Sequence, residues 1–211
     1  METSNPLHTF RTTGVALLIT VVFFMIGAFS AAYFRKVPIP TDPLEQLTLI
    51  ANDRVGWTAQ AIIFSIALLA TAAIFGVIAA RLPGPWPRWL SIAATILFAA
   101  GALLWLSISV SRLQLGANAT EMIRTFDPSA PPPVMVNSWE FWPHTLCVLA
   151  AIALMGTALA LAGVLPVLGW IVAALAVLGA VAGAFVMHDW PPFMSYVILL
   201  VMAIGLMRHG A

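Results

Sequence analysis

Two histidines of this sequence each lie beside a carboxylate, and this pairing is the clearest feature that could carry chemistry. Glu140 and His144 are four residues apart, a spacing that brings both to one face of a helix, and His188 directly precedes Asp189. Gln60 adds a polar group in a largely apolar stretch. We take His144, His188, Asp189, Glu140 and Gln60 as a candidate ligand-binding group.

Such a group offers three kinds of chemistry. Two imidazoles and a carboxylate can bind a divalent metal, two histidines on facing helices can ligate haem, and a histidine can handle a proton at a quinone head group. However, the sequence has no His-x-x-x-His pair and no Glu-x-x-His. We therefore predict no metal site and no resident cofactor. We expect the two histidines to lie at the membrane interface, hydrogen-bonded to carboxylates. Haem or quinone binding is the alternative.

Catalytic motifs are also missing from the sequence. It contains no Gly-x-Ser-x-Gly, no phosphate-binding glycine loop and no His-Glu-x-x-His. We therefore predict no catalytic residue, and the sequence favours a chain that is not an enzyme without deciding the question.

The elements that must position these residues are apolar helices. The 211 residues are 62% hydrophobic and 8% charged, with a mean hydropathy of +1.01, a composition that only a lipid solvent accommodates. All Asp, Glu, Lys and Arg residues fall outside six apolar runs, as expected when a charge at the bilayer centre costs several kcal/mol. The runs are residues 13–34, 57–80, 89–111, 142–165, 167–187 and 191–207. We predict an all-α integral membrane protein, a single membrane domain over 1–211 forming a six-transmembrane-helix bundle, with five spans as the competing count.

The connections between the runs differ in length and charge. The turns at 81–88 and at Pro166 are tight and would share one membrane face, whereas the loops 35–56 and 112–141 would share the other and hold six of the eight carboxylates. Arginine is denser in the short segments, so the positive-inside rule places both termini in the cytoplasm, and we expect a bacterial cytoplasmic membrane. Residues 44–55 and 112–127 show helical amphipathic patterns, which predict two short helices capping the outer face.

Small residues recur at four-residue spacing, which lets helix backbones approach closely in lipid. This spacing favours packing within the chain, with dimerisation as the alternative. The residues are Gly27 and Ala31; Ala72, Gly76 and Ala80; Gly156 and Ala160; Gly179 and Gly183.

Because no span contains an ionisable residue deep within it, a proton-driven pump is not expected. The preferred hypothesis is a non-catalytic accessory or scaffold subunit of a larger membrane complex. Its expected contacts are the lipid bilayer and either membrane-protein partners or a second copy of the chain. The near balance of 9 basic and 8 acidic residues argues against nucleic acid as a partner.

Two other functions stay open. The first is binding of an apolar or amphipathic small molecule (lipid, quinone, haem or pigment) at the outer face, between His144, His188 and Gln60. The second is a membrane enzyme using the outer group of Glu140, His144, His188 and Asp189.

Overall fold

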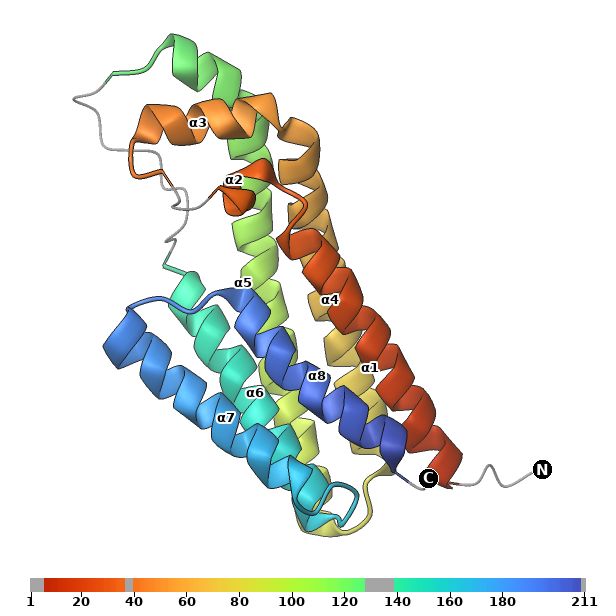
Figure 1. The fold of residues 1–211 in the computed structure, drawn as a ribbon. Coiled ribbons are helices and arrows are strands. Elements are labelled where there is room, and N and C mark those ends of the chain that lie inside the picture. The colour runs from red at the N-terminus through yellow and green to blue at the C-terminus, as the bar shows by residue number, and fades with distance from the viewer. Residues whose placement is uncertain (1–5, 37–39, 128–138, 210–211) are drawn as a thin grey trace.

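The structure is a computed structural model that describes residues 6–36, 40–127 and 139–209, and these ranges are helical with no strand. Five of the helices are long and apolar enough to cross a membrane by length and composition, and a further apolar helix is shorter. The helices pack side by side (Figure 1). The chain is therefore an all-helical protein compatible with several passes through a membrane.

The helices follow one another with short connections. The bounds are α1 Pro6–Ala28, α2 Ala32–Arg35, α3 Pro43–Asn52, α4 Arg54–Arg81, α5 Pro85–Arg124, α6 Phe141–Leu161, α7 Leu168–Ala182, the π-helical turn η1 Gly183–Met187, and α8 Pro192–Arg208.

The two ends of the bundle differ. The start of α1, the end of α8, the α4–α5 turn and the α6–α7 turn lie at one end, which we call the termini end (Figure 1). At the opposite end, called the α3 end, α3 and the adjoining parts of α4 and α5 stand beyond the tops of α6, α7 and α8. The grouping of the tight turns agrees with the prediction from loop length, because two helices joined by a short connection must pack side by side and antiparallel.

Helix α5 departs most from expectation. It has 40 residues without a break, so it is about 60 Å long, roughly twice the hydrocarbon thickness of a bilayer. The separate short helix predicted over 112–127 is wrong, because these residues continue α5 to Arg124. The buried residues Arg112, Gly116 and Ala119 keep one face of this extension packed inward.

The first apolar run is also interrupted. α1 ends at Ala28 and the short α2 begins at Ala32, so the predicted span over 13–34 breaks before its last turn. Asp53 supplies the reason: its carboxylate accepts the backbone N–H of Ala32 at 2.5 Å and that of Gly56 at 3.1 Å. One carboxylate thereby joins the start of α2 to the start of α4.

Small residues bring helices of the chain together. A Cβ on Gly169 would lie 2.5 Å from the Gly156 oxygen, and a Cβ on Gly179 would lie 2.6 Å from the Trp190 indole. Gly27 packs in the same way against Ile63. Three of the four small-residue stretches thus contain a glycine in close contact within the chain, as the packing hypothesis predicts.

Candidate functional site

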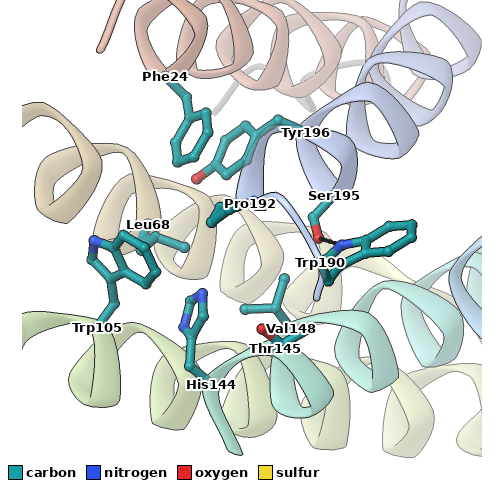
Figure 2. Close-up of a pocket in the computed structure, with 10 residues that line it drawn as sticks. All are labelled: Phe24, Leu68, Trp105, His144, Thr145, Val148, Trp190, Pro192, Ser195 and Tyr196. Carbon is teal, nitrogen blue, oxygen red and sulfur yellow. Dashed lines mark hydrogen bonds between the residues drawn. The ribbon is translucent and has the colours of Figure 1, made fainter. Parts of the chain in front are cut away.

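A pocket lies inside the half of the bundle nearer the α3 end. Figure 2 shows side chains from α1, α4, α5, α6, α8 and the segment before α8 converging on it. The lining residues are Phe24, Leu68, Trp105, His144, Thr145, Val148, Trp190, Pro192, Ser195 and Tyr196. An apolar wall therefore surrounds a few groups that can form hydrogen bonds.

His144 is the central polar group of the pocket. It lies in the first turn of α6 and is only 3% exposed, with its ring centroid 4.7 Å from that of Trp105. Its Nδ1 lies 2.8 Å from the carbonyl oxygen of Gly101. Because a carbonyl only accepts, Nδ1 must carry a proton in this contact, and in the neutral imidazole Nε2 is then the acceptor. In Figure 2 the far nitrogen of the ring points toward Pro192 and Tyr196.

Tyr196 forms the opposite wall. It is 1% exposed, its ring stacks on Phe24 with centroids 3.6 Å apart, and its hydroxyl lies 3.3 Å from Thr71 Oγ1. The Thr71 hydroxyl donates to the carbonyl of Ala67 at 2.8 Å. Tyr196 is therefore the donor to Thr71, and its own oxygen remains available as an acceptor.

Two indoles add further polar groups to the pocket, which Thr145 also lines. Trp190 Nε1 donates to Ser195 Oγ at 2.9 Å, which leaves the Ser195 proton free to donate to another group. Trp105 Nε1 is buried and has no hydrogen-bond partner among the described residues. The pocket thus combines acceptors and donors, all of them on uncharged side chains once His144 is neutral.

The pocket is narrow. Its cavity leaves only about 10 Å³ for the centre of a water molecule. This is roughly the room that one water needs. In this conformation the pocket accepts one oxygen-sized group, and a larger body requires side chains to move.

The structure separates the five residues chosen from the sequence. Only His144 lines the pocket. His188 and Asp189 are exposed, with His188 in the left-handed conformation at φ 51° after η1. Glu140 caps α6 through its backbone and accepts a hydrogen bond from Ser107 Oγ at 3.2 Å.

Gln60 belongs to a different cluster, which sequence reasoning missed. Its Oε1 accepts a hydrogen bond from the guanidinium of Arg112, which is 7% exposed. In the sequence, Arg112 is a charged residue that directly follows the apolar run 89–111. The available signal is that its helical neighbours Gly116 and Ala119 are small, which marks a packed face at three- and four-residue spacing.

Metal ligands do not gather in the described ranges, where no three His, Cys, Asp or Glu side chains are placed to hold an ion. The comparisons add no relative: no protein-family model, no curated protein and no solved structure matches the chain. The functional argument therefore rests on the geometry of the side chains.

Proposed function

We propose that this chain is a non-catalytic membrane protein that binds a small amphipathic molecule through the His144 pocket. The observation that carries the proposal is the commitment of His144 Nδ1 to the Gly101 carbonyl, which leaves an acceptor nitrogen inside an aromatic pocket. A few convergent polar groups in an apolar wall are the usual composition of a site for such ligands.

The narrowness of the pocket limits the ligand. A hydroxyl or carbonyl oxygen, as in a quinol, a quinone or a lipid alcohol, fits the space beside His144, while the apolar part of the molecule lies between helices. A haem held by two histidines is not part of the proposal, since His188 is exposed and does not line the pocket.

The test is extraction of the purified protein followed by mass spectrometry of the extract and a visible spectrum of the intact protein. We expect one species enriched over bulk lipid in the wild type and retained by His188→Ala, which removes an exposed imidazole. His144→Ala should lose most of it. A wild-type extract that contains bulk membrane lipid only would reject the proposal.

We further propose six spans, with α8 as the sixth. Three ring contacts support this count by pairing α8 with α1 in antiparallel order: Phe29 with Phe193 at 6.4 Å, Phe24 with Tyr196 at 3.6 Å, and Phe10 with His209 at 5.8 Å. Because α8 runs beside α1 over this whole length, it covers the depth that α1 covers. The cytoplasmic location of both termini, in a bacterial membrane, stays a prediction from the arginine distribution.

The accessory-subunit role also stays a prediction. It rests on elimination of the other functions, and Gly27 and Gly156, whose spacing could also serve a partner, contact other helices of the same chain. A co-purifying polypeptide at constant ratio after gentle solubilisation would restore that role, and a strictly monomeric mass would remove it.

A further inference from the structure

Arg112 lies in a cluster at the α3 end that is distinct from the His144 pocket. Its guanidinium carbon is 4.3 Å from the ring centroid of Trp57 and 5.0 Å from that of Phe34. Tyr33 packs edge-on against Trp57 with centroids 5.6 Å apart. We call Arg112, Tyr33, Phe34, Trp57 and Gln60 the Arg112 cluster.

The positive charge of this cluster has no negative partner in the described part of the chain. The ion pairs there join Arg35 to Asp53, Lys36 to Glu45 and Arg124 to Glu121, and none includes Arg112. The two internal segments outside the described ranges, 37–39 and 128–138, contain no Asp or Glu. A buried guanidinium without a counter-charge is costly, and cation–π contacts offset only part of that cost.

Two polar atoms of the cluster are also left without partners. Arg112 Nε and the Tyr33 hydroxyl are both buried and make no hydrogen bond to any described residue. Burial raises the pKa of Tyr33, so this hydroxyl stays protonated at neutral pH and cannot neutralise the arginine. Each such atom carries a desolvation penalty that an incoming oxygen would remove.

The position of the cluster indicates which anions it meets. Trp89 is exposed near the start of α5, as expected for an aromatic at a membrane interface. At ~1.5 Å per residue, Arg112 lies about 35 Å further along the helix, and a bilayer core is about 30 Å thick. The cluster therefore lies at head-group depth on the opposite face, where lipid phosphates are the abundant anions. Phe34 is only half-buried, so the cluster reaches the surface at its ring.

We propose that the Arg112 cluster binds a phosphate group, with the guanidinium of Arg112 and the hydroxyl of Tyr33 as its donors, and that an anionic lipid is the source. A guanidinium suits this ligand because its N–H groups form a planar fork that matches phosphate oxygens.

The test measures the thermal unfolding midpoint of the purified full chain in neutral detergent with three additions: phosphatidylglycerol, inorganic phosphate, or diacylglycerol of the same acyl chains. We expect phosphatidylglycerol to raise the midpoint by several degrees and diacylglycerol to leave it unchanged, because a ligand stabilises the state it binds. An equal rise with inorganic phosphate would support the phosphate site and overturn the lipid as its source. Equal rises with phosphatidylglycerol and diacylglycerol would overturn the proposal.

Arg112→Gln should lower the apparent affinity for phosphatidylglycerol at least ten-fold. Arg124→Gln is the matched control, since it removes an exposed arginine from the same helix, and it should leave the affinity within two-fold of wild type. Equal affinity of the wild type and Arg112→Gln would overturn the proposal.

Tyr33→Phe keeps the test decisive if Arg112→Gln does not fold. It removes a buried hydroxyl without a described partner, so the ligand-free midpoint should stay equal or rise, while the shift caused by phosphatidylglycerol should fall at least three-fold. A hydroxyl with only a structural role would not give an unchanged or higher ligand-free midpoint together with a smaller shift by phosphatidylglycerol. An undiminished shift in Tyr33→Phe would overturn the role of Tyr33 and, with it, the two-donor site.

Discussion

The contact between Gly116 and Trp57 shows how single residues shape the α3 end. A Cβ on Gly116 would lie 2.7 Å from Trp57 Cδ1. The indole cannot easily move away, because its Nε1 donates to the Arg112 carbonyl at 2.7 Å and its ring is 1% exposed. Gly116 is therefore a packing requirement of the Arg112 cluster, although it lies inside a helix where glycine is otherwise unfavourable.

This contact predicts the effect of adding one methyl group. Gly116→Ala should lower the free energy of unfolding by about 1–3 kcal/mol, the usual range for overpacking. Gly76→Ala is the control, since its nearest neighbour would be Thr95 Cγ2 at 3.7 Å, an ordinary contact. Thermal unfolding in detergent measures both variants, and an equal effect of the two would contradict the prediction.

The pairing of α6 with α7 is decided at the level of whole elements. Gly156 and Gly169 face each other across this helix pair, where an added Cβ on either would lie 2.7 Å or less from the carbonyl oxygen of the other. In lipid, association of helices depends on such close contact, because apolar burial gives little drive. The same spacing in a sequence also fits a dimer interface, and only the packed structure shows which contact it serves.

We expect Gly169→Ala to push α6 and α7 apart and to lower stability by about 1–3 kcal/mol without changing the oligomeric mass. The obstructing atoms are backbone, so a rotamer change does not relieve the contact. Ala174→Val is the control, because it adds bulk on an exposed position of α7. Unfolding in detergent and mass by light scattering are the measurements. A change of mass in Gly169→Ala would instead indicate a contact between chains.

At the scale of the whole molecule, the start of α1 and the end of α8 lie together at one end (Figure 1). A chain whose ends share one side of a membrane crosses it an even number of times. The proposed sixth crossing by α8 therefore requires that His209, which follows α8, lies on the same side of the membrane as the start of α1.

Cysteine labelling tests this count. In a Cys147→Ser background, Asp189→Cys and His209→Cys should react with a membrane-impermeant maleimide from opposite sides of sealed vesicles. Arg11→Cys should react from the same side as His209→Cys, because Phe10 contacts His209. Labelling of Asp189→Cys and His209→Cys from the same side would show that α8 does not cross.

The amino-acid sequence by itself determined the helical class, the approximate positions of the apolar helices and the shared end of the tight turns. These depend on local hydropathy and loop length, which a single chain displays residue by residue. The sequence did not predict the end of α1 at Ala28, because the carboxylate of Asp53 that binds the backbone N–H of Ala32 is distant in sequence.

Only the tertiary structure decided which polar residues meet. His144 and His188 look equivalent in sequence, yet one turns into the bundle against Gly101 while the other is exposed after η1. The small helical neighbours Gly116 and Ala119 mark a packed face beside Arg112, but nothing near it in the sequence shows that it lies against Trp57 and Phe34. The physical reason is that burial and hydrogen bonding of a side chain depend on helices that pack beside it, and those neighbours come from remote parts of the chain.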